Sequence, residues 1–352
     1  MSALEIGSKF QAVQRSLFDK TAGQFRRPNW AKYLRKPARL DVATVTTSKL
    51  LNRVQDRLSG SIDDVGIAMK DLLSTLSSIK FGVTPDVWKR VMSQCLAHPV
   101  RQMIHQDPFA FRCFTKPRGY AGDAVLIDYL YSRTYQASEH DNVSVLGQRI
   151  FDFTQEIPAG HAVRKRRDIM ALIIDELCDA STQPPHILSV ACGHLREAQL
   201  SKSVAEQRTG RFVALDQDEL SLKLVEREIG GKGITPFYSS IKALFRSSIS
   251  HDKFDLVYST GLYDYLDDRI ATKLTHRMFE MLKPKGRLVV ANFLPHLWCS
   301  AYMEALLDWN LIYRDPEKML TLCSTIPAAE IAKCTTFVEE NQNIVFLEMV
   351  KR

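Results

Sequence analysis

The stretch that decides the fold is Ile187-Leu-Ser-Val-Ala-Cys-Gly193-His-Leu-Arg-Glu197, followed by Phe212-Val-Ala-Leu-Asp216. An apolar strand ends in a tight turn at Gly193, a helix begins, and a second apolar strand ends in an acidic residue. The separation of Gly193 and Asp216 is close to the roughly 20 residues of one βαβ step. This pattern predicts a Rossmann-like sheet that holds an adenosine group, with Asp216 on the ribose hydroxyls.

The chain divides into two parts with different sequence patterns. Residues 1–165 carry apolar residues three and four positions apart, as in 49–58 and 62–79, which predicts a helical domain. Over 166–352, short apolar runs alternate with helical patterns, which predicts βαβ units and a mostly parallel sheet. A helix over Ala162–Asp179 is expected to join the two domains. The predicted strands are 186–191, 211–215, 234–238, 254–259, 286–293, 335–339 and 343–350, the last two forming an antiparallel hairpin.

Seven strands with a terminal hairpin predict an α/β fold, a Rossmann-like class I methyltransferase sheet with an N-terminal helical domain. The turn is looser than the dinucleotide-binding GxGxxG pattern and the GxGxG pattern of methyltransferases. Ala191 and Leu195 occupy the outer glycine positions, and only Gly193 remains. A cofactor without a pyrophosphate tolerates such a turn, because fewer backbone positions must approach it closely. The pattern therefore predicts S-adenosyl-L-methionine (SAM) as the cofactor.

Residues at the ends of the other strands complete the predicted cofactor site. Asp218 is better placed than Asp216 to cap the helix that follows. After the third strand, Ser239-Ser240-Ile241 offers a polar and an apolar side chain to adenine. The fourth strand runs into 259–265, at the strand ends where open α/β sheets bind ligands, so Tyr263 either faces the acceptor or packs under the next helix. The predicted cofactor-binding residues are Ala191, Gly193, Glu197, Asp216, Gln217, Ser240, Ile241, Ser259, Gly261 and Tyr120.

A second motif, Phe114-Thr-Lys-Pro-Arg-Gly-Tyr-Ala-Gly-Asp123, lies in the N-terminal half. Its part Pro117–Asp123 is predicted to be a loop, because proline and two glycines exclude a regular helix. A loop that carries Arg118 and Tyr120 is suited to be a lid over the cofactor. The alternative is an interdomain turn in which Asp123 caps the next helix.

Candidate catalytic residues follow from the chemistry of methyl transfer, which depends mainly on positioning and exclusion of water. Arg164 and Arg167 share one face of a helix, where they either bind a substrate carboxylate or pair with Asp123. His161 and His296 are candidate bases for an amine, hydroxyl or guanidinium acceptor. No metal-ligand spacing is present, so no metal site is predicted. The predicted catalytic residues are Tyr120, Arg118, Tyr263 and Arg164.

Composition limits the class of protein. Of 352 residues, 45% are hydrophobic and 25% are charged, which is typical of a soluble globular chain with room for two domains. The N-terminus lacks the apolar segment of a secretory signal, and the longest apolar runs are too short to span a bilayer. Seven cysteines without paired spacing favour a reducing compartment. We therefore expect a cytoplasmic protein that does not bind membranes.

The net charge of +7 raises nucleic acid as a partner. The basic residues are spread out, apart from clusters at 26–39 and 164–167, and a solvated face with a site for an anionic substrate explains them better. An Asn/Asp-Pro-Pro-aromatic motif, used by enzymes that methylate bases or glutamine, is missing after the fourth strand. A small-molecule substrate is therefore expected, and amphipathic N-terminal helices would suit a homodimer.

Five blocks resemble, in order, a group of bacterial class I methyltransferases identified as 3-hydroxypalmitic acid methyl ester biosynthesis proteins. The resemblance covers roughly residues 105–352, and the Lys-Pro-Arg-Gly-Tyr-Ala-Gly-Asp sequence is its most specific part. It implies a SAM-dependent enzyme associated with a fatty acid methyl ester signal, with related sequences in natural-product pathways. The blocks are Phe114–Asp123, Ala162–Arg167, Ala191–Glu197, Gly261–Leu266 and Asp308–Asp315.

The residues and the resemblance together predict a SAM-dependent methyltransferase with a small-molecule acceptor. Carboxyl O-methylation of a hydroxy fatty acid or related acid, in signal or natural-product biosynthesis, is the leading interpretation, because a carboxylate is ionised at pH 7 and needs no general base. N-methylation of an amino-acid-like precursor is the alternative. An RNA or protein methyltransferase would fit the charge, and a non-catalytic SAM-binding module would fit the missing glycines.

Overall fold

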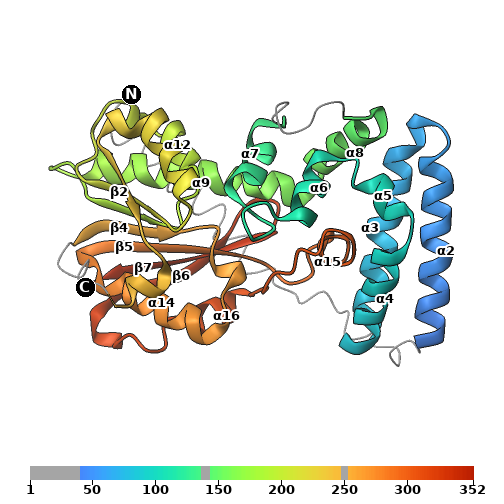
Figure 1. The fold of residues 1–352 in the computed structure, drawn as a ribbon. Helices are drawn as coiled ribbons and strands as arrows, with labels where there is room; N and C mark the ends of the chain where they lie inside the picture. The colour runs from blue at the N-terminus through green and yellow to red at the C-terminus, as the bar shows by residue number, and fades with distance from the viewer. Residues whose placement is uncertain (1–39, 136–142, 247–252) are drawn as a thin grey trace.

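A seven-stranded mixed sheet forms the C-terminal part of the molecule (Figure 1). The structure, a computed structural model, describes residues 40–135, 143–246 and 253–352. The strand order is β3-β2-β1-β4-β5-β7-β6, and β7 is antiparallel to both of its neighbours. This is the sheet of the class I methyltransferase fold, as predicted. The strands are β1 (Ile187–Val190), β2 (Phe212–Asp216), β3 (Ile234–Tyr238), β4 (Phe254–Ser259), β5 (Leu282–Phe293), β6 (Ile331–Val338) and β7 (Ile344–Lys351).

The parallel register brings the carboxyl ends of the central strands to one edge of the sheet. Val190 of β1 lies beside Leu215 of β2, and Asp216 lies beside Tyr238 of β3. On the other side of β1, Ser189 lies beside Tyr258 of β4. The loops that leave these strands therefore meet at the place where open α/β sheets bind ligands.

Helices cover both faces of the sheet because its buried side chains alternate between them. Ile187 and Phe212 belong to a buried cluster that includes α9 and α12, whereas Leu188 and Val213 belong to a second cluster with α14. Figure 1 shows α9 and α12 on one side of the sheet and α14 and α16 on the other. The helices are α2 (Leu40–Leu58), α3 (Val65–Phe81), α4 (Pro85–Ala97), α5 (Val100–Ile104), α6 (Pro108–Thr115), α7 (Ala124–Ser132), α8 (Val145–Glu156), α9 (Pro158–Ala180), α10 (Arg196–Leu200), α11 (Lys202–Ala205), α12 (Glu219–Ile229), α13 (Ile241–Leu244), α14 (Asp268–Glu280), α15 (Ser300–Leu306) and α16 (Pro316–Thr321).

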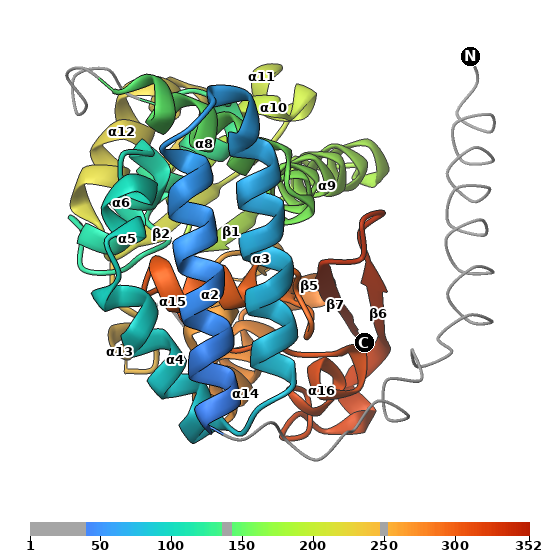
Figure 2. The same ribbon diagram turned by 90° about the vertical axis from the view of Figure 1, so that its right-hand side faces the viewer.

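The helical N-terminal part also contains one helix, α15, from the C-terminal half of the sequence. The helices α2 and α3 run side by side (Figure 2), and α15, which follows β5, packs against α3 and α4. Glu304 of α15 accepts hydrogen bonds from Lys80 Nζ at 2.6 Å and from Trp88 Nε1 at 2.8 Å. The helical layer is therefore built from both ends of the sequence, which its pattern did not predict.

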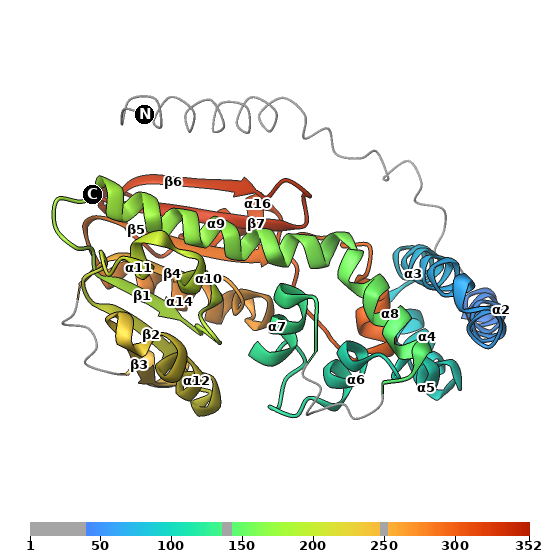
Figure 3. The same cartoon turned by 90° about the horizontal axis from the view of Figure 1, so that it is seen from above.

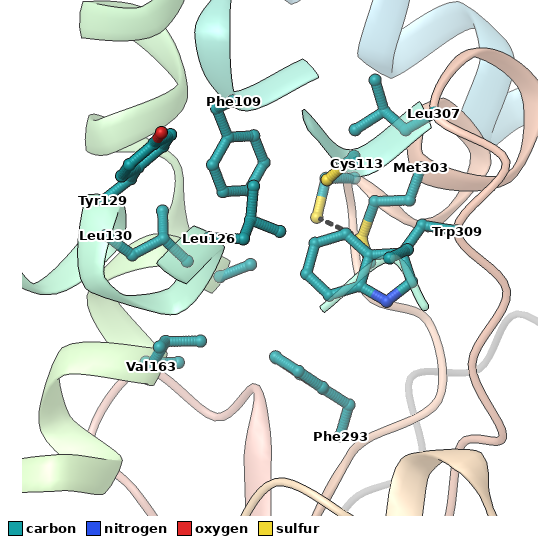
Figure 4. Close-up of a cluster of buried hydrophobic side chains, with 14 of the residues drawn as sticks. Phe109, Cys113, Leu126, Tyr129, Leu130, Val163, Phe293, Met303, Leu307 and Trp309 are labelled. Carbon is teal, nitrogen blue, oxygen red and sulfur yellow. Dashed lines mark hydrogen bonds between the residues drawn. The ribbon is translucent and has the colours of Figure 1, made fainter. Parts of the chain in front are cut away.

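One buried core connects the helices to the sheet. Figure 4 shows Leu126 of α7, Phe293 at the end of β5 and Trp309 gathered in it. The helix α9 runs uninterrupted across the predicted boundary between residues 165 and 166, from the N-terminal helices along the sheet (Figure 3). The division into domains 1–165 and 166–352 stays a prediction.

Two properties concern only the residues that the structure describes. None of their helices combines the length and the apolar character that crossing a membrane requires. No group of three or more His, Cys, Asp or Glu side chains among them is arranged to hold a metal ion.

Candidate active site

A cavity of about 520 Å³ lies at the carboxyl ends of the central strands. Its walls come from the turn after β1, the end of β2, the turn after β4, the helices α7 and α9, and the loop 116–123. This volume falls within the roughly 300–1,000 Å³ of sites that enclose one drug-sized ligand. The two motifs singled out in the sequence, far apart in the chain, therefore meet in one site.

The turn after β1 keeps the backbone shape of a glycine-rich turn although it holds one glycine. Ala191, Gly193 and Leu195 all have positive φ angles, of 55°, 54° and 50°. An L-residue pays a steric cost in this region, and buried Leu195 is held there by the core that surrounds its side chain. Gly193 also lies close to α7, since a Cβ on it would come within 3.3 Å of Ala124 Cβ.

Asp216 organises this turn from the end of β2. Its Oδ2 accepts the backbone N–H of Gly193 at 2.8 Å, and its Oδ1 accepts that of Asp218 at 2.8 Å. Burial raises the pKa of Asp216, and the backbone donors oppose this rise. The carboxylate has about four acceptor positions for the backbone N–H groups of Gly193, Asp218 and Gln217, so acceptor capacity remains for a hydroxyl in the cavity.

Asp218 caps α12, as expected, and also pairs with Arg118 of the loop 116–123. Its side chain accepts the N–H of Leu220 at 3.0 Å at the start of α12. Burial raises the pKa of Asp218, but hydrogen bonds from Ser221 and Arg118 outweigh this and hold it below its ordinary value.

The loop 116–123 is fixed at both ends. Arg118 bonds Asp218 and also donates to Ser221 Oγ at 2.9 Å. At the other end, Asp123 caps α7 through the N–H of Leu126 at 2.9 Å and forms a buried ion pair with Arg112 at 2.9 Å. Asp123 is thus a helix cap, which was the alternative to a role in the site.

Glycine at position 122 allows two aromatic rings to approach this loop. A Cβ there would lie 2.2 Å from Tyr265 Oη and 2.9 Å from Trp309 Cζ2. Tyr120 lines the cavity, and its ring lies edge-on to that of Tyr265 at 6.4 Å between centroids. The loop therefore covers the cavity as an aromatic wall.

Arg164, predicted to be catalytic, is not among the residues that line the cavity. Its guanidinium donates to the carbonyl of Leu130 at 3.0 Å and to that of Gln155 at 2.7 Å, so it ties α9 to the ends of α7 and α8. Arg167 bonds Asp168 at 3.0 Å and lies over the ring of Tyr131. Neither arginine is among the residues that line the cavity, and Asp123 pairs with Arg112 instead, so a catalytic role for Arg164 stays a prediction.

The cavity instead contains Arg166, which the sequence analysis passed over. Arg166 is 6% exposed and lies on the buried stripe of α9, four residues from Ala162 and from Met170. A cation on an otherwise apolar helical stripe was the signal that could have identified it.

Three further predicted residues lie beside the cavity rather than in its wall. Tyr263 is buried and its hydroxyl bonds Thr275 of α14 at 2.9 Å, so it packs under the next helix, which was one of its two interpretations. Ser240 caps α13, and Ser259 is buried within β4. Each has a near neighbour that lines the cavity in its place: Tyr265, Ser239 and Thr260.

The other predicted residues line the cavity together. Glu197 is buried there, accepts the hydroxyl of Tyr258 at 2.8 Å, and has a pKa raised by burial. The predicted residues in the wall are Arg118, Tyr120, Ala191, Gly193, Glu197, Asp216, Gln217, Ile241 and Gly261.

Asp264 is a buried acid of the cavity wall that was not predicted. Its Oδ1 accepts the N–H of Phe293 at 2.7 Å. Burial raises its pKa to about 6, although this N–H and the charges of Arg166 and Arg314 oppose the rise. A carboxyl in this range can hold or release a proton near neutral pH.

The block Asp308–Asp315 closes the far side of the cavity. Trp309 and Leu311 line it, and the fully buried Arg314 donates to the carbonyl of Tyr263 at 2.8 Å and to Asn292 Oδ1 at 2.7 Å. These bonds join the loops that follow β4 and β5. The block thus has a physical role in shaping the site.

The candidate bases His161 and His296 are not among the lining residues, and His161 pairs with Glu156 at 3.2 Å. His194, in the turn after β1, does line the cavity, and its Nδ1 lies 2.8 Å from Asp128 Oδ2 of α7. Asp128 also pairs with Arg196. This cluster fastens the turn to α7, a contact that only the folded chain reveals.

No family model matched the sequence, and no curated protein matched it. Among solved structures, a protein from Bordetella parapertussis described as a possible exported protein is 18% identical, with a TM-score of 0.53 over 88% of this chain and 96% of that one. Magnesium protoporphyrin IX methyltransferase from Synechocystis PCC 6803, with bound S-adenosylhomocysteine (SAH), is 11% identical, with a TM-score of 0.41 over 55% of this chain and 87% of that one. The N-methyltransferase NodS from Bradyrhizobium japonicum WM9 is 13% identical, with a TM-score of 0.39 over 53% of this chain and 97% of that one. The Bordetella protein shares the fold over most of the chain. The strand order and the antiparallel β7 are those of the class I methyltransferase fold.

Proposed function

We propose that the chain is a SAM-dependent methyltransferase that acts on a small-molecule acceptor. The observation that carries the proposal is the Asp216 carboxylate, which is fixed by the turn after β1 and retains acceptor capacity toward the cavity. This is the arrangement by which a Rossmann-like sheet holds the ribose of an adenosine.

The residues of the cavity fit this cofactor. Asp216 and Gln217 would hold the ribose, and Ser239 and Ile241 would flank the adenine. When bound, SAM supplies an electrophilic methyl group on a sulfonium that is already activated. The chain's own residues position the acceptor and exclude water, with Tyr265, Phe293 and Trp309 as apolar wall.

The leading acceptor is a carboxylic acid, a hydroxy fatty acid or a related acid of signal or natural-product biosynthesis. A guanidinium in the cavity wall favours an anionic acceptor, and a carboxylate needs no base. Since the cavity measures about 520 Å³, the cofactor fills much of it, and the remaining space suits a compact acid or the head of a longer one.

The second candidate is N-methylation of an amino-acid-like precursor. The observation that favours it is Asp264, a buried carboxyl of the cavity wall whose pKa is about 6. Such a group could accept the proton that an amine must lose before or during methylation.

The test combines binding with methyl transfer. Titration calorimetry should detect SAH binding to the wild type, at least tenfold weaker binding to Asp216→Ala, and unchanged binding to the control Asp179→Ala, whose side chain is 68% exposed. Methyl-labelled SAM would then be offered with 3-hydroxy acids, amino acids and total RNA. Base-labile label on an acid supports carboxyl methylation, and base-stable label on an amino acid supports N-methylation. Label on RNA overturns the small-molecule proposal, and SAH binding without any transfer indicates a non-catalytic SAM-binding module.

A further inference from the structure

A buried guanidinium in the wall of the cavity lacks a counter-ion. Arg166 is 6% exposed, and in the part of the chain that the structure describes no carboxylate lies within 4.0 Å of it. Its Nε likewise has no hydrogen-bond partner among those residues. Burying a cation without a partner is costly, so such groups are ordinarily paired.

The two buried acids that interact with this charge, Glu197 and Asp264, do not form an ion pair with it. Glu197 is engaged by the hydroxyl of Tyr258, and Asp264 by the N–H of Phe293. Burial raises the pKa of both acids, and the charge of Arg166 opposes the rise without an ion pair to either one. The hydrogen-bond donors of Arg166 are therefore available to a ligand in the cavity.

Gly261 leaves the guanidinium open on one side. A Cβ at this position would stand 3.9 Å from Arg166 Nη2, and both residues line the cavity. Because glycine has no side chain, a small planar group can approach the nitrogen atoms where any other residue would cover them.

We propose that Arg166 is the binding group for a carboxylate of the bound ligand. The guanidinium presents parallel donors that match a carboxylate in two hydrogen bonds. This inference rests on the proposed function, and it assigns a subsite within that site. The carboxylate has two sources, the aminobutyrate tail of the cofactor or an acid acceptor, and the experiment separates them.

The variants are Arg166→Gln, which removes the positive charge, and Arg166→Lys, which keeps the charge but lacks the parallel N–H donors of the guanidinium. Lys165→Gln is the matched control, because it removes one charge from the neighbouring position of α9, where the side chain is 43% exposed. Gly261→Ala places a methyl group over the guanidinium and leaves Arg166 in position. Far-UV circular dichroism checks that each variant is folded. If Arg166→Gln does not fold, the affinities of Gly261→Ala test the proposal instead.

The probes for the cofactor source are SAH and 5′-methylthioadenosine, which lacks the aminobutyrate tail. If Arg166 binds this tail, Arg166→Gln should lower the affinity for SAH at least tenfold and change the affinity for methylthioadenosine less than twofold. Gly261→Ala should act in the same direction, and Lys165→Gln should change neither affinity.

The probes for the acceptor source are 3-hydroxydecanoate and its primary amide, titrated at saturating SAH. If Arg166 binds the acceptor, the wild type prefers the acid at least tenfold, Arg166→Gln loses the preference, and SAH affinity is unchanged. Unchanged SAH affinity in Arg166→Gln, together with no preference for the acid in the wild type, overturns the inference but not the proposed function. A wild-type protein that binds neither SAH nor methylthioadenosine overturns both.

Discussion

Ala191 and Leu195 show at the scale of single residues how a turn keeps its shape without its glycines. Both occupy the left-handed region, at φ 55° and 50°, on either side of Gly193. The sequence identified the turn and Asp216, because strand, turn and acid follow in a fixed order. It did not identify Arg166, because only its place on the apolar stripe of α9 distinguishes it from the other basic residues of 164–167.

Replacing Ala191 by glycine should stabilise the protein. Glycine adopts a φ of 55° without the Cβ penalty, so we expect the free energy of unfolding to rise by about 1 kcal/mol. Ala198→Gly, in the helical stretch that follows, is the control and should lower stability by about 1 kcal/mol. Urea denaturation measures both, and a loss of stability in Ala191→Gly would contradict the steric argument.

Asp264 should make stability depend on pH. Its folded pKa of about 6 exceeds the ordinary value of 3.8, so between these values the folded chain binds a proton that the unfolded chain has released. The contribution of Asp264 to the free energy of unfolding therefore falls as pH rises from about 4 to 6, by up to about 3 kcal/mol in total, and is constant above pH 6. Asp264→Asn keeps an acceptor for the N–H of Phe293 and lacks this dependence. Denaturation of both proteins at several pH values tests it, and parallel profiles would refute it.

At the scale of elements, the sequence predicted the regular structure well and the loops poorly. The expected helix 162–179 is observed as 158–180, and all seven expected strands are present. β5 begins at Leu282 rather than 286, because Leu282 pairs with Phe254 across a bulge that no periodicity reveals. Residues 117–123 were predicted to form a loop, but the packing of this loop against Tyr265 and Trp309 depends on residues more than 140 positions away.

Gly122→Ala tests that packing. The added Cβ would clash with Tyr265 Oη and Trp309 Cζ2, so we expect a loss of about 2 kcal/mol in stability and weaker SAH binding. In a Tyr265→Phe background the nearest clashing atom is absent, and the same substitution should cost less. A double-mutant cycle by thermal unfolding measures the difference, and additive losses would show that the two residues do not interact.

At the scale of the whole molecule, α15 connects the segment after β5 to the N-terminal helices α3 and α4. The helix follows β5 in sequence yet lies against α3 and α4. Sequence pattern alone could not place it, because its short apolar run fits many surfaces equally well. The predicted division at residue 165 therefore describes the sequence pattern, and independent domains would require that these contacts be weak.

Glu304→Ala should destabilise the whole chain. Lys80 and Trp88 Nε1 would lose their shared acceptor, which we expect to cost about 3 kcal/mol, whereas Glu304→Gln keeps one acceptor and should cost less. Tryptophan fluorescence and far-UV circular dichroism should report one coincident unfolding transition in the wild type. Two separate transitions would instead identify the parts before and after residue 165 as independent domains.

The uninterrupted course of α9 also limits how the two parts of the molecule can move relative to one another. Proline and glycine occur in its first turn, at Pro158 and Gly160, and the remaining helix has no residue at which sharp bends are common. Because this rigid rod spans both the N-terminal helices and the sheet, the two parts do not hinge apart along it. For the proposed methyltransferase we therefore expect cofactor and product to exchange by movement of the loop 116–123, which requires Arg118 to release Asp218.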